Sequence, residues 1–303
     1  MELVAESSRD LEISEQKNSG QLSSGALDLF MEELGQVKKD LRTISILPGL
    51  TLTPEARRPA PVSNNPNLAM GNPSAATTDA SNANNYLLVK DQYVMSYNRD
   101  FKTPNWVSWQ LDTDWLGSSG RTGAFSPDES LPASFPRATP GDYKGSGFDR
   151  GHNVPSGDRT RSREDNEATF QMSNIAPQTP DNNQGPWEKL ESYARDLAKQ
   201  GKELYIIAGR DGKRGEIGDG VSVPGDFWKV IVVLPQKGMG VSDVNANTQV
   251  IAVEMPNVNG IRNDDWRKYI TTVDEIERQT GFDLLSNLPD NIENSVEAKR
   301  FGN

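Results

Sequence analysis

Two nearby stretches decide how this chain can be interpreted: residues 149–160 read DRGHNVPSGDRT, and residues 172–195 read MSNIAPQTPDNNQGPWEKLESYAR. The first contains His152, which is the one histidine among 303 residues. The second ends in a predicted helix on which Glu191 and Arg195 stand four residues apart and therefore share a face. On most helices such a pair is a solvated ion pair worth about 0.3–0.5 kcal/mol. The Glu191–Arg195 pair alone therefore indicates no function, and any functional interpretation depends on both stretches.

An imidazole, an amide, a carboxylate and several arginines in this region form a set that could hydrolyse a phosphodiester. A neutral imidazole can take a proton from water, and arginines can hold phosphate. Arg150, Arg159, Arg161 and Arg163 fall within fourteen residues. With an ordinary pKa of about 6.5, His152 is expected to protonate, and activity to fall, below about pH 6. Neighbouring arginines would discourage that protonation.

The same residues also have ordinary structural interpretations. A lone histidine such as His152 is often a polar side chain with a hydrogen-bond partner, and Asp149 is expected to orient its loop. Asn183 suits a turn in which Asp181 and Gln184 form a capping box. Its amide oxygen is equally suited to Mg²⁺, an ion that keeps most of its waters and needs few protein ligands.

Composition limits the classes of protein that fit. The formal charge of -11 argues against binding nucleic acid by bulk attraction. Residues 121–214 hold 14 Lys/Arg and 14 Asp/Glu, so the negative excess lies elsewhere and a local phosphate-binding surface is compatible with the sequence. The absence of cysteine excludes disulfides and thiolate chemistry. No apolar run is long enough for a membrane span, and residues 1–25 lack a signal-peptide pattern.

The chain divides into three predicted regions. Residues 1–47 form an N-terminal segment, mostly disordered, in which 26–45 carries the heptad-like apolar spacing of an amphipathic helix. That helix could pack on its own chain, self-associate or dock on a partner. Residues 48–83 are rich in Pro, Ser, Asn, Ala and Thr and are predicted to be a linker. Residues 84–303 are predicted to form the folded domain.

The predicted domain mixes strands with helices. Strands are predicted at 86–89, 92–97, 106–111, 203–208, 227–234 and 249–255. Helices are predicted at about 163–171, 186–200, 263–269 and 272–280, with an irregular segment at 117–147. The two kinds of element do not alternate regularly, so the pattern favours an α+β domain over a doubly wound sheet.

Three features together resemble one family. These are the DRGH tetrapeptide at 149–152, the Met172-Ser173-Asn174 run, and Asn183 placed eight residues before Glu191. They resemble the DNA/RNA non-specific endonuclease family, nucleases of the ββα-metal (His-Me finger) class, and in particular its bacterial, cyanobacterial-type members. The resemblance extends over about 84–288 and implies a central antiparallel sheet with flanking helices.

The resemblance also implies a role for each residue of the site. His152 matches the general base, and Arg121 stands where the family has an arginine that stabilises the transition state. Asn183 matches the direct ligand of a largely hydrated Mg²⁺ or Mn²⁺, and Glu191 the carboxylate that holds a metal-bound water. The positions that contact phosphate or support the site are Arg150, Asn174, Arg195 and Asp149. The implied activity is hydrolysis of single- and double-stranded DNA and RNA to 5′-phosphate products.

The first 80 residues depart from the simple family pattern. The resemblance implies an extracellular or periplasmic nuclease, but a charged segment and a heptad-like helix stand where a leader is expected. The chain could therefore be an effector delivered through a partner bound by this segment, or a cytoplasmic enzyme. Such a nuclease also implies an inhibitor protein. The alternatives to a non-specific endonuclease are a catalytically silent nucleic-acid-binding protein and a sequence-specific nicking enzyme of the same class.

Overall fold

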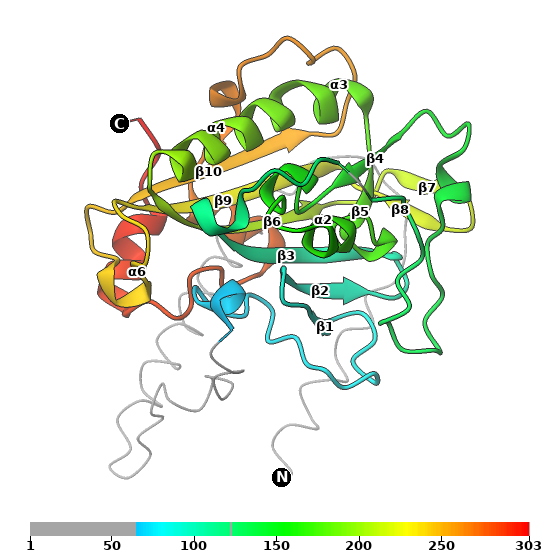
Figure 1. Cartoon of the computed structure of the whole chain (residues 1–303), viewed down its shortest axis with the longest axis horizontal. Helices are drawn as coiled ribbons and strands as arrows, with labels where there is room; N and C mark the ends of the chain where they lie inside the picture. The colour runs from blue at the N-terminus through cyan, green and yellow to red at the C-terminus, as the bar shows by residue number, and fades with distance from the viewer. Residues whose placement is uncertain (1–64, 122, 303) are drawn as a thin grey trace, which may run out of the picture. The chain divides into compact units, whose positions relative to one another are not determined.

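A seven-stranded antiparallel sheet forms the centre of residues 65–121 and 123–302, the part of the chain that the computed structural model describes (Figure 1). The sheet order is β1-β2-β3-β6-β9-β10-β11. Its strands are β1 (Tyr86–Val89), β2 (Val94–Asn98), β3 (Thr103–Leu111), β6 (Glu203–Asp211), β9 (Asp226–Leu234), β10 (Gln249–Pro256) and β11 (Ile270–Thr271). Every pairing is antiparallel, which confirms the predicted α+β class and central sheet. All six strands predicted from the sequence lie in this sheet.

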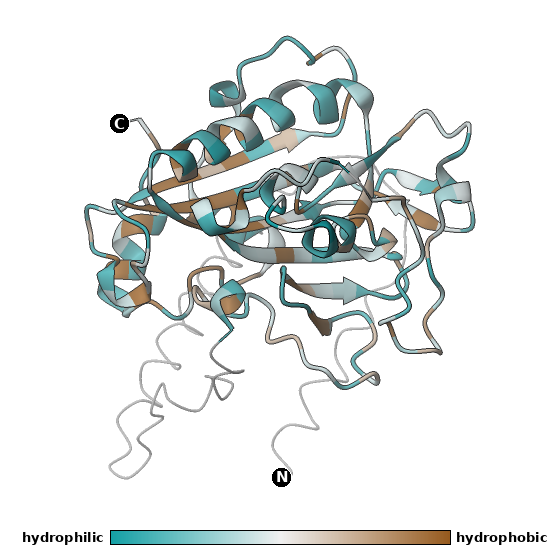
Figure 2. Ribbon diagram, in the orientation of Figure 1, coloured by the Kyte–Doolittle hydropathy of each residue, from teal (hydrophilic) through white to brown (hydrophobic). Residues whose placement is uncertain are grey.

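Strand β9 shows why the central strands are continuous apolar runs (Figure 2). Phe227 and Ile231 belong to one hydrophobic cluster, whereas Trp228 and Val230 belong to another. Successive side chains of a strand point to opposite faces of its sheet, so a strand buried on both faces must be apolar at nearly every position. Lys229 interrupts this run, and the alternation places it on the face of Phe227 and Ile231.

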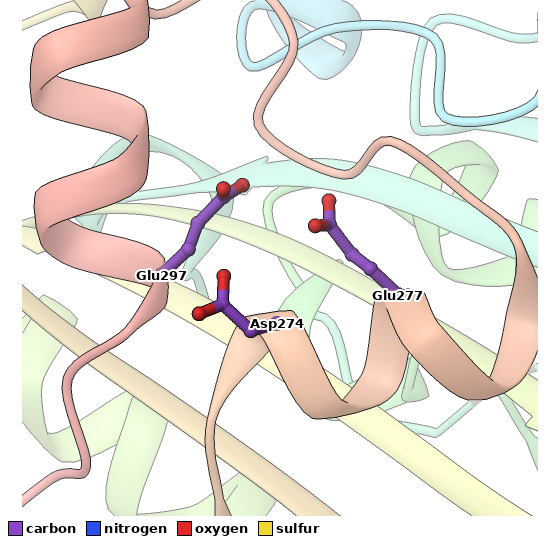
Figure 3. Close-up of side chains that lie close together, drawn as sticks. All are labelled: Asp274, Glu277 and Glu297. Carbon is purple, nitrogen blue, oxygen red and sulfur yellow. The ribbon is translucent and has the colours of Figure 1, made fainter. Parts of the chain in front are cut away.

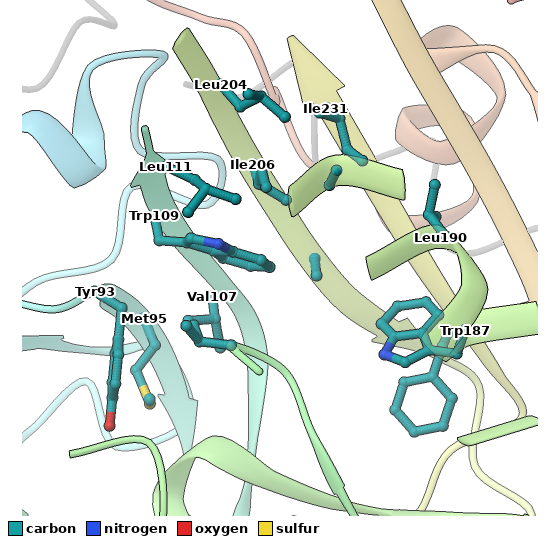
Figure 4. Close-up of a cluster of buried hydrophobic side chains, with 14 of the residues drawn as sticks. Tyr93, Met95, Val107, Trp109, Leu111, Trp187, Leu190, Leu204, Ile206 and Ile231 are labelled. Carbon is teal, nitrogen blue, oxygen red and sulfur yellow. The ribbon is translucent and has the colours of Figure 1, made fainter. Parts of the chain in front are cut away.

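Helices cover both faces of the sheet. They are α2 (Arg163–Ala168), α3 (Pro180–Asn182), α4 (Glu188–Lys199), α5 (Val273–Thr280) and α6 (Asp290–Glu297). On one face α4 packs through Leu190 and Ala194 into the cluster drawn in Figure 4, which also contains Trp109. On the other face α5 and α6 pack through Ile276 and Val296. The sheet therefore separates two helical layers with independent cores.

A small hairpin stands beside the main sheet. Strands β4 (Asp149–His152) and β5 (Ile175–Gln178) pair antiparallel, and the chain then enters the helical run of α3 and α4 (Figure 1). A second hairpin consists of β7 (Gly215–Ile217) and β8 (Val221–Val223). The patterns of the sequence indicate none of these four strands, because each is short and two of them are largely polar.

Some of the predicted helices are confirmed by the structure and others are not. Helices at 163–171 and 272–280 are present as α2 and α5. The helix predicted at 263–269 is wrong, since that segment forms only a 3-10 turn at Trp266–Tyr269. The helix predicted from residue 186 begins earlier, at Pro180, and α6 is not predicted at all because its sequence, DNIENSVE, has few apolar residues.

The structure contradicts the linker prediction for residues 65–83. Leu68 and Met70 are buried in the core of the second helical layer. The side chain of Asn67 accepts a hydrogen bond from the backbone N–H of Gln110 at 3.0 Å. Polar side chains that bond to the backbone hold this segment in place, and such contacts leave no periodic apolar pattern in the sequence.

Residues 1–64 lie outside the described part of the chain. The predicted amphipathic helix at 26–45 and the first part of the predicted linker therefore stay predictions. Among the described residues, no helix has the length and apolar character that crossing a membrane requires.

Candidate active site

The β4–β5 hairpin carries the histidine. In the register of the hairpin, His152 lies opposite Ile175 and Asp149 lies opposite Gln178. A Cβ at Gly151 would come within 2.4 Å of Oε1 and 2.6 Å of Cβ of Gln178. The glycine of DRGH therefore allows the two strands and the Gln178 side chain to approach closely. This explains the third residue of the tetrapeptide in structural terms.

Asn174 fixes the segment that follows the histidine. It is fully buried, its Oδ1 accepts from the N–H of Val154 at 3.0 Å, and its Nδ2 donates to the Val154 carbonyl at 3.0 Å. A second Nδ2 bond reaches the carbonyl of Thr169 at 2.9 Å. The backbone of Asn174 also accepts from the N–H of Asn153 at 3.0 Å. Asn174 thus ties the end of α2 to the segment that follows β4.

Two phenyl rings enclose the imidazole of His152, and each carries an arginine. The centroid of His152 lies 5.3 Å from that of Phe125 and 5.0 Å from that of Phe170. The guanidinium of Arg150 lies 4.5 Å from the Phe125 centroid, and that of Arg121 lies 5.0 Å from the Phe170 centroid. The rings hold both cations near the histidine through cation–π contacts. Neither phenylalanine was among the predicted site residues.

The loop that carries Arg121 is anchored to the turn after α2 that holds Phe170. The N–H of Ser126 donates to the carbonyl of Phe170 at 3.3 Å, and Ser126 in turn accepts from the N–H of Met172 at 2.9 Å. A Cβ at Gly123 would lie 2.0 Å from the Phe170 ring, so only glycine lets the loop cross that ring. These contacts bring the irregular segment before residue 126 to the histidine across a sequence separation of about thirty residues.

The environment of His152 disfavours its charged form. Burial, followed by the charge of Arg121, lowers the pKa of His152 from 6.5 to about 3. Its Nε2 is enclosed and has no hydrogen-bond partner among the described residues. The imidazole is therefore neutral over the whole physiological pH range. The direction agrees with the expected influence of nearby arginines, and burial adds to their effect.

Asp149 orients two amide side chains. Its Oδ2 accepts from Nδ2 of Asn183 at 2.8 Å and from Nε2 of Gln184 at 2.7 Å. Because the NH₂ end of Asn183 is committed to Asp149, its Oδ1 points away from that carboxylate. The half-buried Asn183 thereby presents an oriented oxygen, and Asp149 acts from the strand that also carries His152.

The segment around Asn183 is helical, which corrects the predicted turn. Residues 183–187 form a π-helical turn between α3 and α4, with Gly185 at φ −120° and ψ −118°. A Cβ at Gly185 would lie 2.7 Å from the backbone of Arg262. The predicted capping box is also wrong, because Asp181 and Gln184 both accept from the Arg262 guanidinium at 2.9 Å. Such π-turns are frequent at functional sites, since they redirect side chains within a helix.

Glu191 lies against a buried lysine that the predictions missed. Its Oε1 is 3.5 Å from Nζ of Lys229, and the two side chains are 11% and 2% exposed. Nζ of Lys229 also lies 4.0 Å from the Trp187 ring centroid. Burial raises the pKa of Glu191 despite the opposing effect of Lys229, and burial lowers the pKa of Lys229. The sequence did contain a signal: a single charge inside the apolar run FWKVIVVL.

Arg195 belongs to a second ion pair beside the first. Its Nη1 donates to Oδ1 of Asp158 at 3.2 Å, and its Nη2 donates to Ser192 at 2.9 Å. The other carboxylate oxygen of Asp158 accepts from the indole of Trp109 at 3.0 Å. Arg195 and Glu191 therefore sit in one buried network in which two acids face two bases, rather than in the solvated pair that their helical spacing alone would suggest.

Most of the clustered arginines are committed to structural contacts. Arg159 is fully buried, donates to backbone carbonyls and lies 4.0 Å from the Trp115 ring centroid. Arg161 and Arg163 form ion pairs with carboxylates four residues later, at 2.8 and 2.6 Å. Arg150 is exposed on the histidine side of β4. Of the four arginines, Arg159 is therefore unavailable to phosphate, and Arg150 lies beside the histidine.

The sequence and this geometry can be compared with known proteins. The model of the DNA/RNA non-specific endonuclease family matches residues 70–291. The chain belongs to this family. It is 52% identical over 233 residues to a protein named Nuclease from Nostoc sp., with 77% of this chain and 85% of that protein covered. It is 32% identical over 214 residues to human mitochondrial endonuclease G, covering 66% and 69% of the two chains.

A solved structure supports the same assignment. The crystal structure of an EndoG/EndoGI complex aligns with a TM-score of 0.63 and 25% identity, over 75% of this chain and 92% of that one. This endonuclease-family chain is accordingly a hydrolytic nuclease with the fold of its relatives. Metal dependence is a property of the family.

The donor set of the site suits a metal that needs few protein ligands. In the described part of the chain, three or more acidic or histidine ligand groups come together only at Asp274, Glu277 and Glu297, and none of these belongs to this site. The active site instead offers the oriented amide oxygen of Asn183 and the carboxylate of Glu191. That set fits Mg²⁺, which keeps several waters, better than Zn²⁺, which takes three or four nitrogen, sulfur or oxygen ligands.

Proposed function

We propose that this nuclease is a Mg²⁺-dependent, sugar-non-specific endonuclease that cuts single- and double-stranded DNA and RNA. One observation carries the proposal: the strand that bears His152 also bears Asp149, whose carboxylate orients the amide of Asn183 at 2.8 Å. A single rigid element thus links the base to the metal ligand. Mn²⁺ is a plausible substitute because it accepts the same hard oxygen ligands.

His152 acts as the general base. Its neutral imidazole takes a proton from a water molecule, which attacks phosphorus while the bond to the 3′ oxygen breaks. The leaving 3′ oxygen takes a proton from solvent, so the products carry a 5′-phosphate and a 3′-hydroxyl. The low pKa of the free enzyme rises when an anionic phosphate approaches, because that charge offsets the effect of Arg121 on the imidazole.

Negative charge develops on the phosphate oxygens during attack, and three positively charged groups stabilise it. Arg121 donates to these oxygens from its place over Phe170, and the exposed Arg150 holds an adjacent phosphate. Mg²⁺, when bound through Asn183, supplies further charge stabilisation. Glu191 orients a water of the ion's hydration shell, a supporting role for a carboxylate at the border of the core.

The arginines and the metal determine how far the enzyme discriminates between nucleotide sequences and between DNA and RNA. Arginines and a metal contact the phosphate, which is the same in every nucleotide. Recognition through the backbone therefore gives little discrimination between DNA and RNA. The chain's excess of negative charge argues against broad electrostatic capture, so binding rests on this local set.

A protein inhibitor is a proposed partner. The related EndoG structure was determined as a complex with EndoGI and concerns inhibition, and a nuclease that cuts without sequence preference endangers the cell that makes it. For the place of action, the family resemblance favours an extracellular or periplasmic compartment. A delivered effector that docks through residues 26–45, or a cytoplasmic enzyme, are the alternatives.

Digestion of circular single-stranded DNA and a folded RNA tests the proposal. Wild type should degrade both in Mg²⁺ and neither in EDTA, whereas His152→Ala and Asn183→Ala should lose at least a hundredfold in rate. Glu164→Gln, an exposed change on α2, is the control and should retain full activity. Discrete bands would indicate a sequence-specific enzyme. Full activity of His152→Ala would refute the base, and binding without cleavage would indicate a silent nucleic-acid-binding protein.

The chemistry of the ends provides a second test. If the bond to the 3′ oxygen breaks, polynucleotide kinase should label the products only after phosphatase treatment. Labelling without phosphatase would place the cut on the other side of phosphorus.

A further inference from the structure

A cluster of three carboxylates lies on the layer opposite to the active site. Asp274 and Glu277 occupy one face of α5, and Glu297 ends α6. One ligand oxygen from each lies within 4.8 Å of the other two, and the three side chains point toward one another between the helices (Figure 3). Because α5 and α6 pack on the face that α4 does not cover, this cluster is separate from the nuclease site.

Glu297 is the member of the cluster that needs an explanation. It is 5% exposed, and its Oε1 is enclosed without a hydrogen-bond partner among the described residues, although its side chain shares a hydrogen bond with that of Glu277. The charged groups with the largest effect on it are Glu277, Glu293, Asp274 and Asp283, all of them acidic. Burial and these neighbours raise the pKa of Glu297 to about 9. A buried carboxylate among carboxylates is unfavourable unless a cation or a proton compensates it.

The basic side chains nearest in sequence are used elsewhere. Nζ of Lys299 donates to the carbonyl of Ala246, and Nη2 of Arg300 donates to the carbonyl of Ile270 at 2.5 Å. On α5 itself, Arg278 is paired with Glu275 on the exposed side. No ion pair of Asp274, Glu277 or Glu297 with a basic side chain is present in the described part of the chain.

We propose that Asp274, Glu277 and Glu297 form a binding site for Ca²⁺ that joins α5 to α6. Ca²⁺ takes six to eight oxygen ligands in flexible geometry, and three carboxylates, each able to bind through two oxygens, supply much of that number. Asp274 is exposed, so waters can complete the shell from its side. Mg²⁺ fits less well because it demands a small octahedron and releases its waters reluctantly.

Ca²⁺ at this site would stabilise the C-terminal helix. It would satisfy the enclosed Oε1 of Glu297 and neutralise the mutual repulsion of the three acids. Glu277 already accepts from the N–H of Leu284 at 2.7 Å, so one of its oxygens is fixed and the other is positioned toward the cluster. The ion would therefore join α6 to an element that is already ordered.

Calorimetric titration with Ca²⁺ tests the site in the full chain. The Asn183→Ala variant is the starting protein, so that the proposed active-site ligand does not contribute. One Ca²⁺ should bind per chain, and adding Glu297→Gln should abolish that binding while adding Glu275→Gln, a change at a neighbouring half-buried acid on α5, should not. Asp274→Asn should weaken binding at least tenfold, and since this residue is exposed it provides a variant that keeps the fold.

Thermal unfolding gives an independent measurement. Ca²⁺ should raise the Tm of the starting protein by several degrees and leave that of the Glu297→Gln form unchanged. Absence of Ca²⁺ binding to the starting protein, a preference for Mg²⁺ over Ca²⁺, or equal binding by the Glu297→Gln form would each overturn the proposal. None of these outcomes depends on the nuclease reaction, so a failed calcium site and a failed catalytic assignment can be told apart.

Discussion

Buried carboxylates on the two faces of the central sheet are compensated in different ways. On the α4 face, Glu191 lies 3.5 Å from Lys229 and Asp158 lies 3.2 Å from Arg195, so each acid faces a base. On the α5–α6 face, the charged groups with the largest effect on Glu297 are all acidic. The neighbouring charges of Glu191 therefore favour a carboxylate, whereas those of Glu297 disfavour one. A group paired within the chain has a fixed charge, whereas one left unpaired depends on what the solution supplies.

Removing Lys229, the buried cation on the α4 face, should have the largest effect of the changes considered for the two faces. Lys229→Met should lower the free energy of unfolding by about 3–5 kcal/mol, because Glu191 must then either stay charged in the core without a partner or take up a proton. Activity should fall about 10–100-fold, since a protonated Glu191 no longer orients water in the metal's shell. Chemical denaturation and initial rates measure the two effects.

A double variant separates these two effects. Lys229→Met/Glu191→Gln should regain most of the lost stability, because no unpaired charge is left, while its activity stays low. Lys199→Met, an exposed change on α4, is the matched control and should leave both quantities unchanged. If Lys229→Met cuts at the wild-type rate, Glu191 does not need its partner and its proposed role is wrong.

The same kind of change on the other face should have the opposite sign. In EDTA, Glu297→Gln should raise the Tm at pH 8 by about 5–10 °C, since a domain of this size gains about 2–4 °C per kcal/mol. The folded pKa of Glu297 is raised to about 9 from an ordinary 4.5. Its contribution to stability is therefore complete below pH 4.5 and is lost progressively as the pH rises toward 9.

Unfolding curves at several pH values check this prediction. Wild type in EDTA should lose stability between pH 5 and 9 more steeply than Glu297→Gln, and Ca²⁺ should reduce that difference. Equal slopes without metal would show that Glu297 is not the strained group that its surroundings indicate.

How far the sequence predicts these two faces depends on what fixes each element. The main strands were predicted correctly because burial on both faces demands apolar, β-branched runs such as that of β9. Strand β4 was missed because DRGH forms a strand through its pairing with β5 and the Asn174 bonds, not through propensity. The sequence NNQG predicts a turn. Its π-helical shape cannot be predicted from local sequence because it depends on contacts with the distant Arg262.

The site residues divide in the same manner. Motif spacing indicates His152, Asn183 and Glu191 as candidates, since they lie within forty residues of one another in the sequence. Lys229 comes from a strand in the second half of the chain, and Phe170 acts by enclosing the imidazole, so neither belongs to a local motif. The Glu297 cluster depends on the meeting of two polar helices, of which α6 was not predicted.

The smallest expected effect concerns His152, whose charge is set by its surroundings rather than by a partner. An ordinary histidine of pKa about 6.5 would lose roughly thirtyfold in activity at pH 5. With the pKa lowered to about 3, the imidazole stays neutral there, so kcat/KM of wild type should change less than about threefold between pH 7 and pH 5 in saturating Mg²⁺. Arg121→Ala removes the second cause of the low pKa and should shift the acid limb upward. A wild-type limb near pH 6 would mean that the phenyl rings do not shield the imidazole as the structure indicates, and that its charge, like that of Glu297, is governed by solution conditions.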